Sequence, residues 1–206
     1  MSLVLASASP ARLTTLRGAG IEPRVIVSGV DESVVPSDGT LDPAEFACRL
    51  AALKAEAVSD RLERDGDRAR FVLGCDSVLE LDGRIFGKPA DADDARARWG
   101  TMSGRSGVLH TGHCLRDRDH DKTLVRGAAT VVHFAEVTEP EITAYVATGE
   151  PLEVAGAFTI DGLGGAFVRG VEGDPHTVVG LSLPVLREMF AELGLTWTDL
   201  WGAMSR

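Results

Sequence analysis

The stretch Leu3-Val4-Leu5-Ala6-Ser7-Ala8-Ser9-Pro10-Ala11-Arg12 combines a short apolar run, two hydroxyl side chains, a helix start and a cation. Residues 3–6 are too few to span a membrane, but such a run bounded by small polar residues is typical of a buried strand. Ser9 favours the N-cap of a helix, and Pro10 fits the first helical position because its missing N–H would have had no partner there. The stretch therefore predicts a strand followed at once by a helix that continues to Arg17.

The start of this helix has two interpretations. Arg12 stands at the third helical position, where Glu or Gln would form a capping box, so the helix start keeps free N–H groups. Such groups, together with the positive end of the helix dipole, attract phosphate. From these residues alone, Ser9-Pro10 is equally consistent with a simple helix cap.

The length and composition indicate a globular protein. A chain of 206 residues is long enough for a sizeable core, and we expect one domain over residues 1–206. Hydrophobic residues at 44% and charged residues at 25% are ordinary for a packed domain and unlike a disordered chain. No segment has the pattern of a signal peptide or the length of a membrane span, so we expect a cytoplasmic protein without a membrane partner. Cys48, Cys75 and Cys114 form no C-x-x-C pair, which argues against a disulfide framework and a cysteine zinc site.

The charge balance restricts the partners. A net charge of −10 opposes binding of long nucleic acid, which depends on many phosphate contacts from Lys and Arg. A small anion stays compatible with this charge if cations gather locally or a divalent metal accompanies the anion. The sequence leaves open whether the chain forms a homodimer.

Single strands, hairpins and helices alternate along the chain. The apolar runs predict strands over residues 23–28, 71–75, 78–81, 84–86, 108–115, 123–134 and 166–168, with Asp82-Gly83 as a two-residue hairpin turn. Helical patterns occur over residues 46–57, 91–102, 138–147 and 183–193, and residues 173–176 have the composition of a loop. This order predicts an α/β or α+β fold with a mixed sheet.

Polar residues follow several of the predicted strands. These residues are Ser7, Ser9 and Arg12, then Asp31 and Glu32, then Asp76 and Ser77, with Lys54 and Lys88 as further candidates. Ligands of α/β proteins bind at such strand ends. Phosphoryl or nucleotidyl transfer uses these residue types together, because cations offset phosphate charge and carboxylates hold Mg²⁺. Each residue alone also suits a structural role, but Asp76 directly follows an apolar run, where a charged group normally needs a metal or a cation.

Other catalytic signatures are absent from the sequence. The stretch Gly83-Arg84-Ile85-Phe86-Gly87-Lys88-Pro89 has three residues between its glycines where a P-loop has four, and Pro89 replaces the metal-binding hydroxyl. There is no G-x-S-x-G and no H-E-x-x-H motif. His110 and His113 lie three apart on a predicted strand, so they point to opposite faces and do not favour a shared metal.

Eight short motifs resemble the Maf family of nucleoside triphosphate pyrophosphatases, in that family's order and over nearly the whole chain. They are Leu5-Ala6-Ser7-Ala8-Ser9-Pro10-Ala11-Arg12, Val30-Asp31-Glu32, Leu53-Lys54-Ala55, Gly74-Cys75-Asp76-Ser77-Val78, Gly87-Lys88-Pro89, Met102-Ser103-Gly104, Gly149-Glu150-Pro151-Leu152 with Ala155-Gly156-Ala157, and Val179-Gly180-Leu181.

The resemblance implies a fold, an activity and a set of site residues. The implied fold is Maf/inosine-triphosphatase-like α/β, with an elongated mixed sheet flanked by helices and two lobes around a central cleft. The implied activity is hydrolysis of a nucleoside triphosphate to the monophosphate and pyrophosphate, dependent on Mg²⁺, Mn²⁺ or Co²⁺, in nucleotide-pool house-cleaning. By matching motif, Asp76 is the proton acceptor and a metal ligand, Glu32 a second metal ligand, and the triphosphate is held by Ser7, Ser9, Arg12, Lys54 and Lys88.

Three positions depart from the common family pattern. Ala11 replaces an arginine, Ser77 replaces a threonine, and Asp161 replaces a glutamine, and these are the positions that the resemblance associates with base preference. The base therefore stays open. The missing cation at Ala11 also leaves an alternative function, a nucleotide-binding regulator of cell division and septum formation with little turnover.

Overall fold

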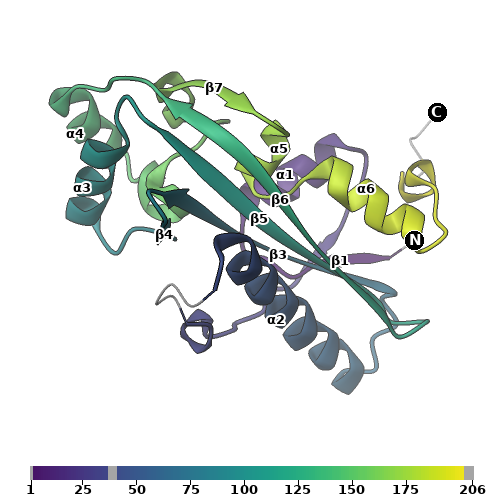
Figure 1. Cartoon of the computed structure of the whole chain (residues 1–206). Helices are drawn as coiled ribbons and strands as arrows, with labels where there is room; N and C mark the ends of the chain where they lie inside the picture. The colour runs from purple at the N-terminus through teal and green to yellow at the C-terminus, as the bar shows by residue number, and fades with distance from the viewer. Residues whose placement is uncertain (1, 37–40, 202–206) are drawn as a thin grey trace.

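The computed structural model describes residues 2–36 and 41–201, and its centre is one mixed β-sheet (Figure 1). The sheet has the strand order β2-β1-β3-β5-β6-β7, and β4 pairs with β3 outside this path. The strands are β1 (Leu3–Leu5), β2 (Arg24–Val25), β3 (Phe71–Leu81), β4 (Arg84–Phe86), β5 (Ser106–Asp117), β6 (Lys122–Phe134) and β7 (Val168–Glu172).

Helices lie on both faces of this sheet. The α-helices are α1 (Pro10–Gly18), α2 (Pro43–Arg64), α3 (Ala92–Met102), α4 (Glu139–Ala147), α5 (Pro175–Val179) and α6 (Leu183–Glu192). The 3₁₀ helices are η1 (Glu32–Val34), η2 (Glu150–Glu153), η3 (Ala155–Ala157), η4 (Leu163–Phe167) and η5 (Trp197–Leu200). The predicted α/β fold with an elongated mixed sheet flanked by helices is confirmed.

The long helix α2 covers one face of the sheet at close range. A Cβ atom at Gly74 of β3 would lie 2.2 Å from the carbonyl oxygen of Ala51, and one at Gly112 of β5 would lie 2.4 Å from the backbone of Ala47. Because only glycine lacks that atom, these two residues let the helix backbone approach the strands directly. This close packing fixes the height of α2 above the central strands.

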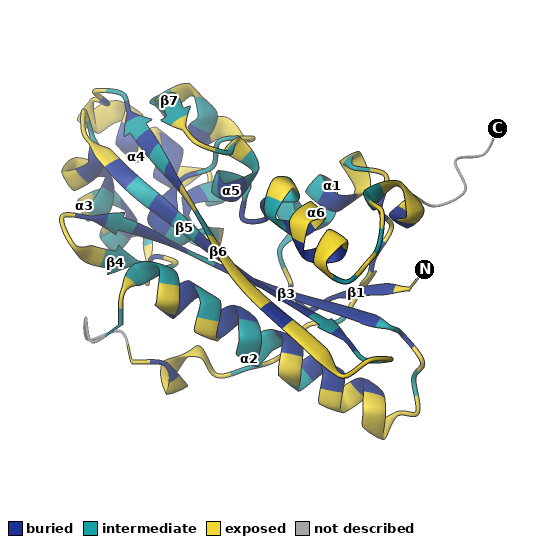
Figure 2. Cartoon of the chain, turned by 45° about the vertical axis from the view of Figure 1, so that its right-hand side comes forward, coloured by how far each residue is buried: buried dark blue, intermediate teal, exposed yellow. Residues whose placement is uncertain are grey.

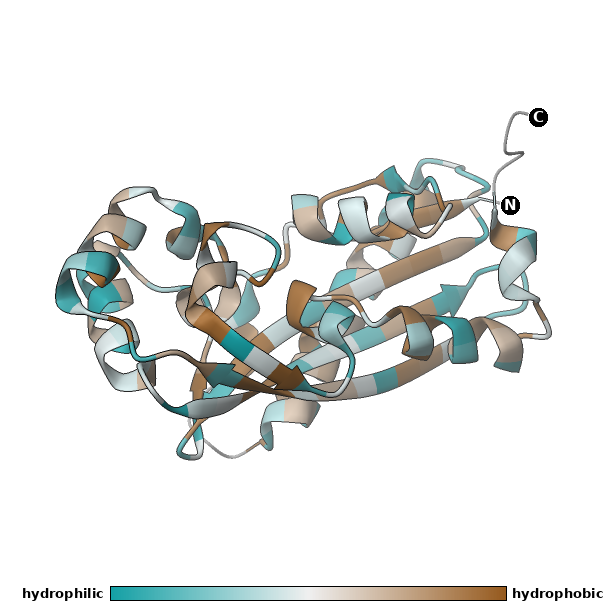
Figure 3. Ribbon diagram, turned by 90° about the horizontal axis from the view of Figure 1, so that it is seen from above, coloured by the Kyte–Doolittle hydropathy of each residue, from teal (hydrophilic) through white to brown (hydrophobic). Residues whose placement is uncertain are grey.

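The opposite face carries two separate apolar clusters, which form the two lobes (Figure 2). One cluster joins Leu73 of β3 to Phe190 of α6, and the other surrounds Trp99 of α3. Neighbouring residues of a strand point to opposite faces, so Val72 packs under α2 while Leu73 packs under α6. Figure 3 shows the most hydrophobic segments along the strands, as expected for a core built on the sheet.

Local signals in the sequence predicted several elements well. Ser9 caps α1, and its Oγ accepts a hydrogen bond from the backbone N–H of Arg12 at 3.4 Å. Leu81 of β3 pairs with Arg84 of β4 across the predicted turn, and Asp82 and Gly83 adopt φ values of 53° and 74°. Two positive φ angles are typical of the tight hairpin turns that Asp-Gly favours.

The structure corrects four sequence predictions. Residues 71–75 and 78–81 form the single strand β3, because β5 pairs continuously with residues 71–80. The predicted loop 173–176 instead starts helix α5, for which Asp174 is the N-cap and Pro175 the first residue. The predicted strand 23–28 is reduced to Arg24–Val25, and the strand predicted at 166–168 begins at Val168 instead.

None of the helices in the described residues combines the length and the apolar character that crossing a membrane requires.

Candidate active site

The candidate site lies at a gap in one edge of the sheet. Strand β5 occupies one edge of β3, so β1 and β4 must share the other. There β1 pairs with residues 71–73 and β4 pairs with residues 79–81. Within the described residues, the edge of residues 74–78 that faces away from β5 therefore has no strand partner. Asp76 is the central residue of this gap. The prediction that Asp76 follows the end of its strand was wrong, because it is the neighbouring strands that end there.

The α2 side of the gap holds an acidic and basic cluster. The Nζ atom of Lys54, on α2, lies 2.5 Å from Oδ1 of Asp76 and 2.7 Å from Oε1 of Glu32, at the start of η1. The Lys54 and Asp76 side chains are only 12% and 11% exposed, whereas Glu32 is 58% exposed. Lys54 therefore bridges a buried carboxylate and an accessible one.

Burial dominates the electrostatics of Asp76. Loss of water contact raises the pKa of this carboxyl above its usual value, although the charges of Lys54 and Arg12 oppose the rise. Glu32 adds a smaller effect that also raises the pKa of Asp76. A carboxylate in such surroundings is a stronger base than one at the surface, and its second oxygen, Oδ2, is not used by the Lys54 contact.

The opposite face of β3 holds the guanidinium of Arg12. Its Nε donates to the carbonyl of Gly180 at 2.7 Å, and its Nη2 donates to Ser77 Oγ at 3.1 Å. Its Nη1 donates to Ser7 Oγ at 3.1 Å and to the carbonyl of Cys75 at 2.9 Å. Four of the five N–H groups of the guanidinium thus have partners within the described residues, and one on Nη2 remains.

The connection between β1 and α1 carries the other predicted site residues of the opening stretch. Ser7 is 6% exposed, and its Oγ also accepts the backbone N–H of Ser9 at 3.2 Å. Ala11 lies half-buried in the first turn of α1, between the Ser9 cap and Arg12. The sequence from strand to helix therefore places the hydroxyls of Ser7 and Ser9 and the Arg12 side chain on one short connection.

The structure brings some predicted site residues together and leaves others apart. Ser7, Arg12 and Ser77 form one contact cluster, and Glu32, Lys54 and Asp76 form another, joined through the consecutive residues Cys75 to Ser77. Lys88 lies just after β4, where its Nζ is 3.6 Å from Glu153 and its side chain is 63% exposed. Asp161 lies exposed in the loop before η4.

The loop that carries Asp161 wraps around the carboxylate of Glu150. Glu150 accepts hydrogen bonds from the Tyr145 hydroxyl at 2.9 Å, from Thr159 Oγ1 at 2.6 Å, and from two backbone N–H groups at 3.0 Å each. Those two N–H groups belong to Leu163 and Gly164. Burial raises the pKa of Glu150, but these hydrogen bonds outweigh it and hold the value at about 2.

Sequence reasoning missed several residues around Arg12, and it also missed Glu150 beside the loop that carries Asp161. Gly180 and Glu150 lie in motifs of the resemblance but carried no assigned role, and Thr111 and His113 carried none as site residues. Thr111 Oγ1 lies 2.8 Å from Ser77 Oγ and donates to the carbonyl of Thr177 at 2.8 Å. Gly180 ends the short helix α5 in a left-handed conformation, with a φ of 107°, and because the sequence did not predict this helix it gave no signal for Gly180.

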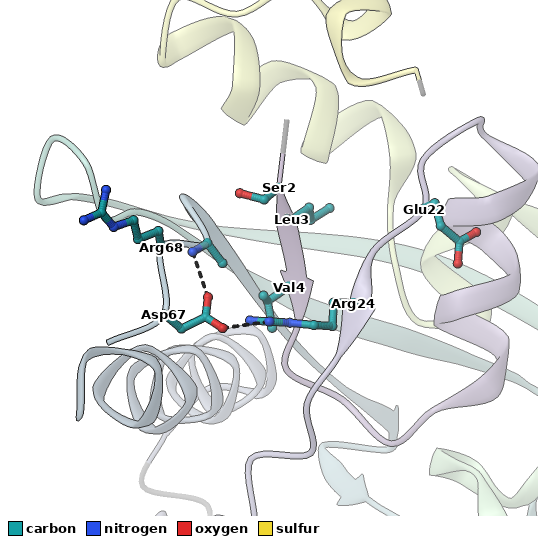
Figure 4. A pocket seen from close by; sticks show the side chains of 8 residues that line it. Ser2, Leu3, Val4, Glu22, Arg24, Asp67 and Arg68 are labelled. Atoms are coloured by element: carbon teal, nitrogen blue, oxygen red, sulfur yellow. Dashed lines mark hydrogen bonds and ion pairs between the residues drawn. The ribbon is translucent and has the colours of Figure 1, made fainter. Parts of the chain in front are cut away.

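A cavity of about 450 Å³ lies elsewhere, at the start of β1 (Figure 4). Its lining includes Ser2, Glu22, Arg24, Asp67 and Arg68. Two of its charged groups pair with each other, because Arg24 Nη1 lies 2.7 Å from Asp67 Oδ2, and Glu22 pairs with Arg17 at 2.6 Å. None of the predicted site residues lines this cavity.

The fold and the site define a mixed α/β protein with an acidic and basic cluster at a break in the sheet edge. The model of the family described as Maf-like protein matches residues 2–193. The chain belongs to this family, as its sequence motifs predicted.

Relatives extend the comparison over the whole chain. The chain is 62% identical to the nucleoside triphosphate pyrophosphatase of Salinispora tropica over 98% of this chain and 88% of that protein. It is 54% identical to the nucleoside triphosphate pyrophosphatase of Streptomyces coelicolor, over 97% of this chain and 94% of that one. Among solved structures it is similar to the Ham1 protein of Staphylococcus aureus, with 17% identity and a TM-score of 0.42 over 66% of this chain and 73% of that chain. The names of the two relatives agree with the predicted enzyme class.

Proposed function

We propose that the chain is a metal-dependent nucleoside triphosphate pyrophosphatase, which releases a nucleoside monophosphate and pyrophosphate. The observation that carries this proposal is the buried contact between Lys54 and Asp76 at the sheet gap, with Arg12 on the other face of the same strand. Relatives named nucleoside triphosphate pyrophosphatase support it. Removal of ordinary or modified triphosphates from the nucleotide pool is the role that we propose for this activity.

The residues fit a hard divalent cation. Glu32 and Asp76 both contact the Lys54 ammonium, so two carboxylates converge on one small region. Within residues 2–36 and 41–201, no group of three or more His, Cys, Asp or Glu side chains could hold a metal alone. Mg²⁺ is often bound by one or two carboxylates together with substrate phosphates and water, so Glu32 and Asp76 are suitable ligands. When bound, the ion would offset charge on the phosphate oxygens.

Each of the site residues has its own role in the proposed reaction. Asp76 takes a proton from water at Oδ2, and its raised pKa favours that step. The water oxygen forms a bond to the α-phosphorus, the bond from that phosphorus to the bridging oxygen breaks, and pyrophosphate leaves. Arg12 and Lys54, with Lys88 from the other lobe, offset the charge of the triphosphate. Ser7 and Ser9 supply hydroxyl donors beside them, and Ala11, Ser77 and Asp161 are proposed to influence base preference.

The test is turnover of a panel of triphosphates by the purified protein. Ordinary and modified triphosphates are incubated with Mg²⁺, Mn²⁺ or Co²⁺, and monophosphate, pyrophosphate and orthophosphate are measured. We expect pyrophosphate without prior orthophosphate, and we expect Asp76→Asn to lower kcat by roughly 10²–10⁴-fold while the protein stays folded. Asp60→Asn is the control, because Asp60 is an exposed carboxylate on α2, the helix that carries Lys54, and should leave kcat close to wild type. Tight nucleotide binding without turnover would instead favour the nucleotide-binding regulator of cell division.

A further inference from the structure

A row of buried polar side chains lies between the two apolar clusters of the sheet. Thr111 and His113 of β5 are 0% exposed, and Thr130 of β6 is 1% exposed. Buried polar groups are costly unless they are hydrogen-bonded. Each of these three side chains forms a hydrogen bond with one segment, residues 174–182, which contains α5 and the N-cap residue of α6, Ser182.

The bonds anchor that segment at three points. Thr130 Oγ1 donates to the carbonyl of Asp174 at 2.9 Å, and Thr111 Oγ1 donates to the carbonyl of Thr177 at 2.8 Å. The backbone N–H of Ser182 donates to Nε2 of His113 at 2.8 Å. Figure 1 shows α5 beside β5 and β6, from which these side chains come.

His113 is held in one protonation state. Its Nε2 accepts the Ser182 N–H, so the ring proton is on Nδ1, which lies 3.3 Å from the carbonyl of Arg126. Burial lowers the pKa of His113 to about 4, so the ring is neutral at neutral pH and keeps its acceptor. Protonation of His113 therefore does not remove the acceptor of the Ser182 N–H at neutral pH.

Gly180 lies between two of these anchors. Its carbonyl accepts the Nε–H of Arg12 at 2.7 Å, while Thr177 is fixed three residues before it and Ser182 two residues after it. Gly180 has a φ of 107°, and a Cβ there would lie 3.1 Å from Arg12 Nε and 3.3 Å from Ser77 Oγ. Thr111 also contacts Ser77 Oγ, the partner of Arg12 Nη2. The direction of the Arg12 guanidinium thus depends on where this segment is held.

We propose that Thr111 and His113 are positioning residues for triphosphate binding: by anchoring Thr177 and Ser182 they fix the Gly180 carbonyl, which aims the remaining N–H of Arg12 at the substrate. This inference rests on the proposed function, because it assumes that Arg12 contacts the triphosphate. Neither side chain touches the substrate itself.

The main experiment compares two variants of His113 in the full-length protein. His113→Leu removes the acceptor for the Ser182 N–H, and His113→Gln replaces it with an amide oxygen. We expect His113→Leu to raise KM for the triphosphate about tenfold with kcat changed less than about threefold, and His113→Gln to restore KM to near the wild-type value. Thr111→Val should likewise raise KM for the triphosphate, and Thr111→Ser should keep KM near the wild-type value.

Thr130→Val is the matched control. It removes a hydroxyl-to-carbonyl hydrogen bond, as Thr111→Val does, from a side chain that is 1% exposed, but that bond anchors Asp174, six residues before Gly180. KM should therefore stay close to wild type. An unchanged KM in folded His113→Leu, or an equal rise in Thr130→Val, would overturn the positioning role.

A second readout does not depend on turnover. Hydrogen exchange at the Ser182 amide should accelerate in His113→Leu and stay slow in His113→Gln, because only the first loses the acceptor. If wild-type protein turns over no triphosphate, the proposed function fails whatever the exchange shows. If wild-type protein is active and the Ser182 amide stays equally protected in His113→Leu, the positioning inference fails alone.

Discussion

The Nζ atom of Lys54 lies 2.5 Å from Oδ1 of Asp76, across the interface between α2 and β3. Gly74, two residues before Asp76 on the same face of β3, lets α2 approach closely enough for this contact. Lys54 is also the link to Glu32, so a single side chain connects a buried carboxylate with an exposed one. The position of Lys54 beside Asp76 therefore depends on the close packing of α2 on Gly74.

Replacing Lys54 with Met should abolish turnover and destabilise the fold. Asp76 would lose the charge that most opposes the rise of its pKa, and breaking a buried ion pair should cost about 3–5 kcal/mol in the free energy of unfolding at pH 7. The pKa of Asp76 would move further above its ordinary 3.8, so the stability deficit should grow as pH rises above that value. Urea unfolding at several pH values measures this deficit.

Lys54→Arg is the control for this variant, because it keeps the positive charge at the gap. It should recover most of the stability and only part of the activity, since guanidinium and ammonium groups differ in shape. Wild-type turnover in Lys54→Met would exclude Lys54 from the reaction.

Replacing Gly180 with Ala should weaken both the fold and triphosphate binding. A side chain at φ 107° is strained, and its Cβ would push against Arg12 Nε and Ser77 Oγ. We expect a loss of about 1–3 kcal/mol in the free energy of unfolding and a raised KM. Gly100→Ala, in α3, is a suitable comparison, because a Cβ there meets nothing within 4 Å and Ala favours the helix. Equal stability of the two variants would contradict the crowding at Gly180.

Local chemistry accounts for the parts of the fold that the sequence predicted. The turn at Asp82-Gly83 and the cap at Ser9-Pro10 depend on the residues themselves, so they could be recognised without the rest of the chain. Helix α5 (Pro175–Val179) could not be recognised in this way. It is short, and it is held in place by hydrogen bonds from Thr111 of β5 and Thr130 of β6. Tertiary contacts determine whether such a short helix forms, and its amino-acid composition is that of a loop.

The candidate site also contains residues that the sequence could reveal and residues that it could not. Asp76 could be recognised because a carboxylate inside an apolar run needs a partner, although its strand continues past it. His113 gave no comparable signal, since its partner Ser182 lies 69 residues away and a lone histidine on a strand has many structural roles. Lys88 was a candidate from its residue type and from the resemblance, whereas Asp161 depends on the resemblance alone. The described contacts join neither of them to Asp76.

Replacing Lys88 with Ala should affect binding without affecting stability. Its contact with Glu153 at 3.6 Å is between side chains that are 63% and 81% exposed, and such pairs contribute little. If Lys88 reaches the triphosphate, KM should rise about tenfold or more while the thermal midpoint changes little. Steady-state kinetics and thermal unfolding of Lys88→Ala and Lys88→Arg separate these effects, and an unchanged KM would remove Lys88 from the site.

Replacing Glu150 with Gln should reveal a stability term that depends on pH. The pKa of Glu150 is about 2 in the folded chain and ordinarily 4.5, so its ionised form favours the folded state. This stabilisation is fully present above pH 4.5 and is lost as pH falls toward 2. At pH 7 we expect Glu150→Gln to unfold with a free energy about 1–3 kcal/mol below wild type, and the difference should shrink at pH 3.

Glu153→Gln is the control for losing a carboxylate that lies outside the hydrogen bonds of Glu150. Glu153 ends the same 3₁₀ helix as Glu150, but its side chain is 81% exposed and its ion pair with Lys88 is long. Its stability should therefore follow wild type at every pH, because an ion pair between such exposed side chains contributes little to the free energy of unfolding. A Glu150→Gln deficit that stayed constant between pH 7 and pH 3 would mean that the four hydrogen bonds act through packing of residues 159–164 and not through the charge of Glu150.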